Sequence, residues 1–287
     1  MRIWEAGLLG VVQGLTEFLP ISSTAHLVVA RTALGHPHVE DAFTTIVQLG
    51  TLVAVFAYFR SDILGIAQAL ILDVRTCRFA SSPESRLAWL IALGSVPVVV
   101  IGFTLKKWLK ANFYDLPTMG LVAVLFASLM AAAEVWRSIR TDRATPETSE
   151  AEITWLQSLW IGIWQALALM PGASRSGTTL TGATFAGLTR PAAARFSFLL
   201  SLPSILGAGL KELYDEVKLF RNPDLEPRPS LFAEADDVAA LAVGLLVSAI
   251  VGYAAIWGLI AFLRRYGLWV FIAYRLVLGM ALILWSR

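Results

Sequence analysis

The chain contains 287 residues, of which 57% are hydrophobic and 15% are charged. Soluble domains carry about 25% charged residues, so this composition excludes an ordinary soluble domain and indicates an integral membrane protein. The formal net charge of +2 argues against a nucleic-acid partner, and the single cysteine excludes an internal disulfide and a thiolate metal cluster.

Hydrophobic segments occupy most of the chain. The first, residues 3–30, lacks the basic start of a signal peptide and carries Glu5, Gln13, Glu17 and His26, so we expect it to belong to the mature fold. Seven further runs are near or above the length of about 17–25 residues that a membrane-spanning helix needs. They are residues 42–59, 87–105, 118–133, 153–170, 192–210, 238–263 and 268–285. These runs predict an all-α integral membrane protein.

A first polar interruption lies within VVQGLTEFLPISSTAHL, residues 11–27. Gln13 and Glu17 are four residues apart and share one helix face, and Pro20 is expected to end that helix. The polar residues that follow the proline are Ser22, Ser23, Thr24 and His26. Such groups serve general acid–base catalysis, nucleophilic attack or divalent-metal binding. An ionisable group such as Glu17 is costly at membrane depth, which indicates a functional role.

A second interruption lies within MPGASRSGTTLTG, residues 170–182. Pro171 and Gly172 are expected to end one helix, and Ser174 to cap the next by accepting hydrogen bonds from free backbone N–H groups. These N–H groups and the helix dipole favour an anion, and the planar guanidinium of Arg175 suits two phosphate oxygens at once. The sequence therefore predicts a phosphate site formed by Ser174, Arg175, Ser176, Gly177 and Thr179.

Each of these polar groups also has a purely structural interpretation. Arg175 is compatible with an interfacial loop from which it reaches water, and Gln13 and Glu17 with a polar pair between helices. His26 is compatible with an interior histidine whose ring nitrogens are satisfied. Arg275, in the last apolar run, is expected to pair with a backbone carbonyl or an acid.

The chain resembles itself at an offset near 152 residues. The pattern G-x-x-Q-x-L at residues 10–15 recurs at residues 162–167, and each copy leads to a proline and then to serines. We therefore expect two membrane repeats, residues 1–136 and 153–287, joined by a hydrophilic linker at residues 137–152. If each repeat is a re-entrant helix hairpin followed by about three transmembrane helices, the second repeat is inverted relative to the first. Arginines flank the spans on both sides, so charge assigns no orientation.

The two interrupted segments closely resemble the signature segments of the undecaprenyl-diphosphate phosphatases, also called bacitracin-resistance proteins. In QGLTEFLPISSTAHL, Gln13 and Glu17 match the family's Glu-or-Gln, three residues, Glu pattern, and His26 stands at its histidine position. PGASRSGTT matches Pro-Gly-x-Ser-Arg-Ser-Gly-x-Thr at residues 171–179. QLGTLVAV, FSFLLSLP and FIAYRL resemble further family segments in the expected order, so the resemblance covers essentially the whole chain.

This resemblance implies a membrane hydrolase that converts undecaprenyl diphosphate, a long-chain prenyl diphosphate lipid, to undecaprenyl phosphate and inorganic phosphate. Such an enzyme recycles the lipid carrier for cell-wall synthesis and gives bacitracin resistance. The resemblance also implies two inverted repeats with re-entrant hairpins and a site open to the outer face of the bacterial cytoplasmic (inner) membrane. It further implies a divalent cation, Mg²⁺ or Ca²⁺. Assembly as a homodimer stays open.

Two positions depart from the family pattern. Arg195 stands where some relatives carry a glutamate, so we do not place it in the site. Gln13 occupies a position that glutamate often holds, which leaves Glu17 as the one carboxylate of the pair and the expected metal ligand.

In the expected mechanism the diphosphate enters the junction of the two hairpins, where Arg175 and backbone N–H groups neutralise its charge. Glu17 holds the metal or acts as a base, and Gln13 and Ser22 support the site. Ser23, His26 and water are competing nucleophiles. His26 is also a candidate base for Ser23, if their separation of three residues brings the two side chains together.

Two other functions fit part of the pattern. A carrier that flips polyprenyl phosphate is the main alternative, because inverted repeats with broken helices are also transporter architecture. Only hydrolysis requires Glu17 and a nucleophile, so released phosphate separates the two. A phosphatase of the other membrane lipid-phosphatase family is disfavoured, because its lysine and arginine-proline motif and its late histidine do not occur in the right order.

Overall fold

The computed structural model describes residues 1–35, 42–142, 147–225 and 230–285, and these ranges are almost entirely helical. They contain no β-strand beyond an isolated bridge between Thr148 and Leu188. The described helices of the first half are α1 (Ile3–Phe18), α2 (Ser23–Ala33), α3 (Ala42–Tyr58), α4 (Arg60–Arg75), α5 (Pro83–Phe113) and α6 (Leu116–Asp142). Those of the second half are η1 (Glu150–Glu152), α7 (Trp155–Leu167), α8 (Arg175–Phe185), α9 (Arg190–Arg221), η2 (Pro223–Leu225), α10 (Ala235–Leu263) and α11 (Trp269–Trp285).

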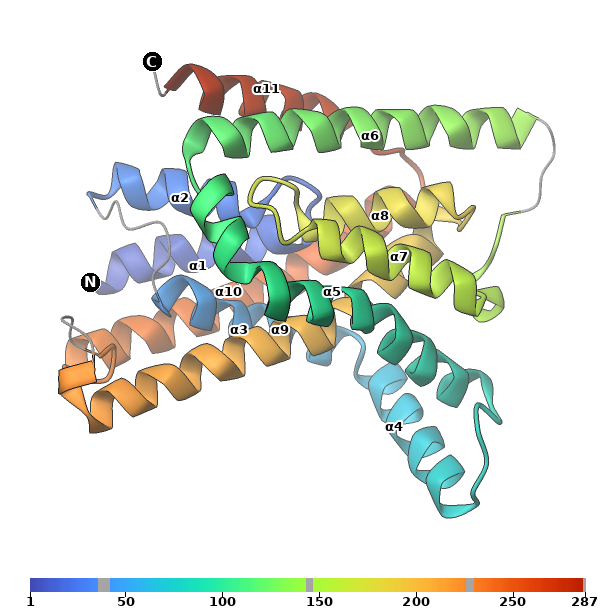
Figure 1. Ribbon diagram of the computed structural model, residues 1–287, viewed down its shortest axis with the longest axis horizontal. Helices are drawn as coiled ribbons and strands as arrows, with labels where there is room; N and C mark the ends of the chain where they lie inside the picture. Colours follow the sequence, from blue (N-terminus) through green and yellow to red (C-terminus); the bar gives the residue numbers. More distant parts are fainter. Residues whose placement is uncertain (36–41, 143–146, 226–229, 286–287) are drawn as a thin grey trace.

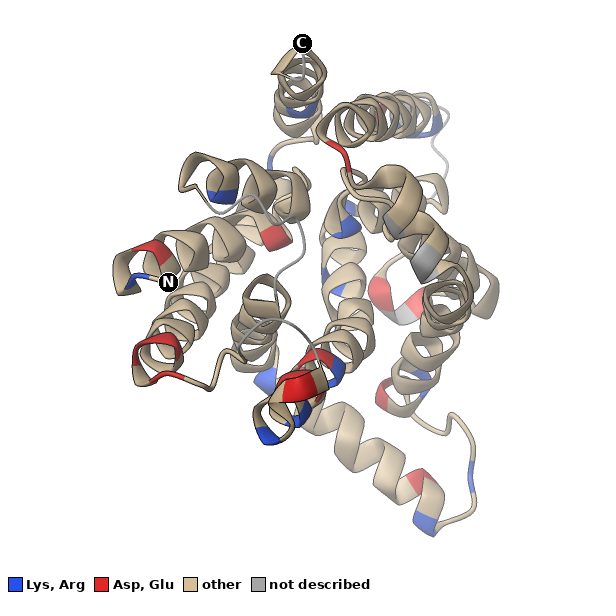
Figure 2. Cartoon of the chain, turned by 60° about the vertical axis from the view of Figure 1, so that its left-hand side comes forward, with Lys and Arg blue, Asp and Glu red and all other residues tan. Residues whose placement is uncertain are grey.

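The length and apolar surface of the helices confirm a membrane protein. Among the described helices, α5, α6, α9 and α10 are each long and apolar enough to cross a bilayer. Helices α3 and α4 pass the same test together despite an 80° bend between them, and α11 is a shorter apolar helix of 17 residues. Large apolar side chains such as Phe103, Trp257 and Val277 are exposed on outer faces, where lipid can cover them. Figure 2 shows charged residues gathered mainly near helix ends. The chain is therefore a multi-pass, all-α membrane protein.

The two interrupted segments form helix hairpins, α1–α2 and α7–α8, and the first break lies where Pro20 predicts. Proline disfavours helical geometry in the residue before it, and Leu19, before Pro20, is extended with ψ of 138°. Ser22 and Ser174 cap the second helix of each hairpin with their hydroxyl oxygens. The hairpins enter from opposite ends of the molecule and their breaks meet in the middle (Figure 1). This meeting point holds most of the predicted site residues.

Each hairpin packs against a helix of the opposite half of the chain. Helix α1 packs along α10, and a Cβ added to Gly10 would lie 2.7 Å from the carbonyl oxygen of Gly244. Helix α7 packs along α5, where a Cβ on Gly162 would collide with the carbonyl of Gly94. Small residues allow membrane helices to approach closely, which explains why these positions are glycine. Each half of the chain thus supplies a helix that packs against the hairpin of the other half, and this packing fixes the positions of the two breaks.

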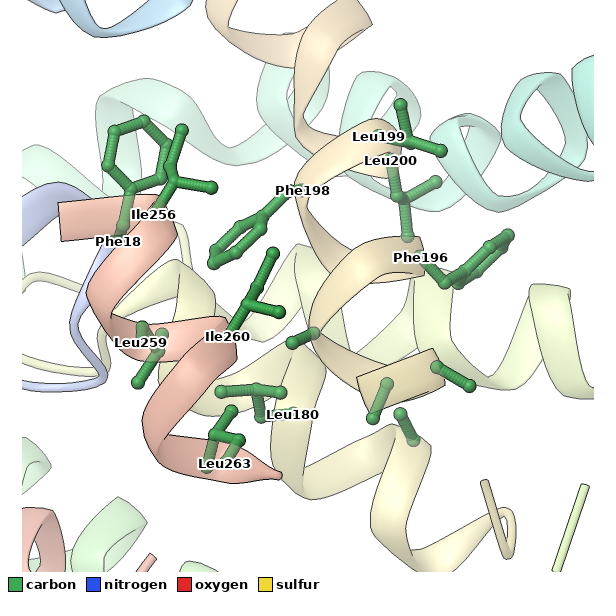
Figure 3. Packing of buried hydrophobic residues seen from close by; sticks show 14 of the residues in the cluster. Phe18, Leu180, Phe196, Phe198, Leu199, Leu200, Ile256, Leu259, Ile260 and Leu263 are labelled. Atoms are coloured by element: carbon green, nitrogen blue, oxygen red, sulfur yellow. The ribbon is translucent and has the colours of Figure 1, made fainter. Parts of the chain in front are cut away.

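An apolar cluster supports the breaks from one side. Phe18, the last residue of α1, packs edge-on against Phe198 of α9, with ring centroids 5.4 Å apart. Leu180 of α8 and Ile256 of α10 belong to the same buried cluster (Figure 3). Three helices, α8, α9 and α10, therefore converge on the end of α1, and dense packing there limits how far the break can move.

The structure differs from the sequence prediction in three places. Helix α4 was not predicted, although residues 63–72 are apolar except for Gly65 and Gln68. The run at residues 153–170 contains a helix of only 13 residues, because the turn before Pro171 already ends α7 at Leu167. In the expected linker, α6 continues to Asp142, η1 occupies Glu150–Glu152, and residues 143–146 lie outside the described residues. The inverted relation of the two repeats, with about three spans each, stays a prediction.

Candidate active site

The two breaks are joined directly by hydrogen bonds. The Ser176 hydroxyl, in the first turn of α8, donates to the carbonyl oxygen of Leu19 in the first break at 3.0 Å. Ser174 and Ser176 place their hydroxyl oxygens 3.3 Å apart beside it. Since the breaks carry both polar motifs, groups that are 157 and 158 residues apart in sequence form one site.

Glu17 is the centre of this site. One carboxylate oxygen pairs with the guanidinium of Arg175, and the other accepts hydrogen bonds from the Gln13 amide at 2.9 Å and the Ser23 hydroxyl at 2.8 Å. The Glu17 side chain is 3% exposed, whereas that of Arg175 is 21% exposed. A buried carboxylate is tolerated here because three donors surround it. The guanidinium of Arg175 is partly exposed and is therefore accessible to a ligand.

The first turn of α8 offers an anion both charge and N–H donors. The other arm of the Arg175 guanidinium donates to Ser204 of α9 at 3.2 Å, so the side chain is held between two helices. The Ser174 hydroxyl accepts from the amide of Gly177 at 3.2 Å, which confirms the predicted cap. Thr179 is fully buried and its hydroxyl donates to the carbonyl oxygen of Arg175 at 2.8 Å. Phosphate binding by Ser174, Arg175, Ser176, Gly177 and Thr179 stays a prediction.

His26 lies apart from Ser23 in its contacts. One ring nitrogen, Nδ1, is 2.7 Å from the carbonyl oxygen of Ser22, and the other, Nε2, is 2.6 Å from the hydroxyl of Tyr274 on α11. Within the described ranges no hydrogen bond joins Ser23 to His26, so the expected base for Ser23 is not in place. The two side chains point to different helices: Ser23 donates to Glu17 of α1, whereas His26, one turn later, bonds to Tyr274 of α11.

Arg275 follows Tyr274 on α11 and holds the second break. Its side chain is completely buried and donates to the carbonyl oxygens of Gly172 and Ala173 at 3.1 and 2.8 Å, which confirms the expected carbonyl pairing. A Cβ added to Gly177 would come within 2.5 Å of a guanidinium nitrogen of Arg275, so the glycine makes room for it. Arg275 therefore serves the geometry of the break.

Arg195 lies outside the site, as expected. It pairs with Asp62 at the start of α4 and with Glu150 of η1, the latter at 2.5 Å. It precedes Ser204 by nine residues on α9, which is about 13 Å along a helix. Burial raises the pKa of Glu150, against the lowering effect of Arg195. Arg195 thus joins the α3–α4 bend to the segment between the two halves.

Sequence reasoning missed Ser204 and Tyr274, which touch Arg175 and His26. Tyr274 stands in FIAYRL, beside Arg275, and Ser204 directly follows FSFLLSLP; both segments resemble known family segments. Neither residue belongs to the two polar motifs, so the resemblance and the neighbouring Arg275 were the available indications.

Comparison with known proteins assigns the family. The family model described as "Bacitracin resistance protein BacA" matches residues 6–281. A protein from Chlorobium chlorochromatii (strain CaD3) named undecaprenyl-diphosphatase is 42% identical over 283 residues, which are 99% of this chain and 96% of the relative. Proteins of the same name from Chlorobium phaeobacteroides (strain BS1) and Chloroherpeton thalassium (strain ATCC 35110 / GB-78) are each 41% identical over the same shares. The chain therefore belongs to the bacitracin resistance protein BacA family.

Proposed function

We propose that this chain hydrolyses undecaprenyl diphosphate to undecaprenyl phosphate and inorganic phosphate, and so recycles the lipid carrier for cell-wall synthesis and gives bacitracin resistance. The observation that carries the proposal is the convergence of Glu17, Ser23 and Arg175 where the two breaks meet. It unites a base, a hydroxyl and a cation within a membrane protein, and full-length relatives at about 40% identity are named for this reaction.

In the proposed first step, Ser23 Oγ attacks the terminal phosphorus of the diphosphate. The hydroxyl proton passes to Glu17, the acceptor 2.8 Å away. The bond from the terminal phosphorus to the bridging oxygen breaks, and undecaprenyl phosphate leaves with the electron pair. Water then attacks the phosphorus of the phosphoserine and the bond from phosphorus to Ser23 Oγ breaks. Glu17 returns its proton to Ser23 Oγ, and inorganic phosphate leaves with the oxygen and protons of the water. Arg175 and the N–H groups at the start of α8 neutralise the charge on the transferred group, which is the main demand of phosphoryl transfer.

The contacts favour Ser23 over the other nucleophile candidates. Its hydroxyl is the one bonded to Glu17, whereas both His26 ring nitrogens are already engaged. Gln13 supports the Glu17 carboxylate, and Ser22 caps the helix on which Ser23 stands. Quenching in denaturant at neutral pH during turnover, followed by mass spectrometry at neutral pH, separates the candidates, because phosphohistidine is lost in acid. We expect phosphate on Ser23, whereas phosphate on His26, or none on the protein, would contradict this assignment.

A divalent cation, Mg²⁺ or Ca²⁺, is part of the proposal. The donor set fits such an ion in one respect: the amide oxygen of Gln13 is buried without a hydrogen-bond partner beside the Glu17 carboxylate. Mg²⁺ is usually held by one or two protein oxygens together with substrate phosphates and water. Gln13 and Glu17 are therefore the residues we assign to it. When bound, it would polarise the phosphate oxygens and offset their charge.

Phosphate release by purified protein in detergent tests the function. Wild-type protein should release phosphate from a long-chain prenyl diphosphate and lose activity with a chelator. Ser23→Ala and Glu17→Gln should each lose at least about 100-fold, because nucleophilic and acid–base groups contribute at this level. Ser128→Ala is a matched control, since Ser128 is exposed and, among the described residues, its hydroxyl bonds only to Val124 of its own helix. Folded wild-type protein without phosphate release, with metal supplied, would refute the hydrolase and favour the polyprenyl-phosphate carrier.

We further propose that the protein lies in the bacterial cytoplasmic membrane and that its site opens to the outer face. The family resemblance supports this proposal. Cys77 is the chain's single cysteine, so Ser23→Cys in a Cys77→Ser background offers one reactive thiol at the site. Labelling of intact cells by a membrane-impermeant thiol reagent is expected. Labelling only after the cells are opened would contradict the outer-face assignment. Assembly as a homodimer stays a prediction.

A further inference from the structure

The hydrogen bonds of His26 define its protonation pattern when the ring is neutral. A carbonyl oxygen only accepts, so the contact of 2.7 Å with Ser22 requires the proton on Nδ1. Nε2 is then an acceptor, and the hydroxyl of Tyr274 donates to it at 2.6 Å. The hydroxyl of Tyr274, the His26 ring and the Ser22 carbonyl form one continuous chain of hydrogen bonds from α11 to the first break.

The residue at the end of this chain has an unusual backbone. Ser22 has φ of 74° and ψ of 93°, a left-handed conformation that residues with a Cβ rarely adopt. Such a conformation persists only when its surroundings hold it. Ser22 directly precedes Ser23, so the orientation of the Ser22 peptide decides where the Ser23 hydroxyl points relative to Glu17.

The second break repeats this arrangement. Ser174 has φ of 67°, and the carbonyls of the two residues before it are held by Arg275. Tyr274 and Arg275 are consecutive residues of α11, so neighbouring side chains of one helix act on both turns, Tyr274 through His26 and Arg275 directly. The Tyr274 and His26 rings also lie nearly parallel, with centroids 5.7 Å apart and an angle of 9° between planes.

We infer that Tyr274 is a positioning residue for the proposed reaction: by binding Nε2 of His26, it holds the ring against the Ser22 carbonyl and so keeps the Ser23 hydroxyl on Glu17. The inference rests on the proposed function. Tyr274 contacts His26 and not the reacting groups, so its loss should slow turnover more than it weakens substrate binding.

Tyr274→Phe tests this assignment because it removes the hydroxyl and keeps the ring. We expect kcat to fall about ten-fold, as one hydrogen bond permits, with KM changed less than two-fold. Tyr253→Phe is the matched control: the two tyrosines are 42% and 44% exposed, and the Tyr253 hydroxyl makes no hydrogen bond within the described part of the chain. It should retain wild-type kcat.

A double-mutant cycle and a spectrum separate positioning from general damage. In a His26→Ala background, Tyr274→Phe should cause no further loss, because Tyr274 acts through His26. The chain has three histidines, so the ¹⁵N spectrum of histidine-labelled protein is simple. Wild-type His26 should show the Nδ1–H tautomer, and Tyr274→Phe should shift its Nε2 resonance, whereas Tyr253→Phe should not.

Three results would overturn the inference: wild-type kcat in Tyr274→Phe, additive losses in the double variant, or an unchanged Nε2 resonance. Failure of the proposed function has a different signature. If wild-type protein releases no phosphate, the hydrolase is refuted, while the spectra still decide whether Tyr274 binds His26.

Discussion

Removing Arg175 should destabilise the protein because it leaves the charged Glu17 carboxylate buried without its cationic partner. In Arg175→Ala the carboxylate keeps two neutral donors, Gln13 and Ser23, but loses its cation. Breaking a buried ion pair by removing one partner costs about 3–5 kcal/mol. Since two donors stay and Arg175 is 21% exposed, we expect the lower end of this range, about 3 kcal/mol.

A second substitution isolates the electrostatic part of this cost. Glu17→Gln removes the buried charge and keeps a side chain of similar size, so Glu17→Gln with Arg175→Ala should be more stable than Arg175→Ala alone. Neither variant should release phosphate. Denaturant unfolding in detergent, followed by circular dichroism, measures the stabilities. The reasoning is refuted if Arg175→Ala is as stable as the wild type, or if adding Glu17→Gln lowers its stability further.

Three further predictions concern the second break, the start of α6 and the ion pairs of Arg195. Ser174→Ala should lower the free energy of unfolding by about 1 kcal/mol and Ser174→Gly by less, since φ of 67° suits glycine; denaturant unfolding checks this order. Hydrogen bonds from Thr118 lower the pKa of Asp115. The stability that this carboxylate contributes is therefore complete above the usual Asp pKa of about 4 and is lost as pH falls through the lowered value. The melting temperature of Asp115→Asn should consequently fall less with acid than that of the wild type. Arg195→Ala should lower the melting temperature, because Asp62 and Glu150 lose their cation, yet keep kcat in the phosphate assay.

The sequence by itself determined the features that depend on neighbours in the chain. Pro20 breaks its helix locally, by blocking helical geometry at Leu19, whereas α7 already ends at Leu167, ahead of Pro171. Ser22 and Ser174 cap the helices that follow. Membrane insertion likewise follows from the length and apolarity of the runs that form α5, α6, α9 and α10. The motifs also named Glu17 and the other residues that meet at the two breaks, because their chemistry is costly in a membrane without a function.

The tertiary structure alone decided which groups touch. The sequence offered His26 as the partner of Ser23, but the structure pairs Ser23 with Glu17 and His26 with Tyr274, 248 residues later. It also placed Ser204 on Arg175 and revealed α4. Spacing along one helix predicts only which residues share a face. Contacts between distant segments depend on how closely and at what angle helices pack. Many small residues acting together, such as Gly10 and Gly162, set this packing.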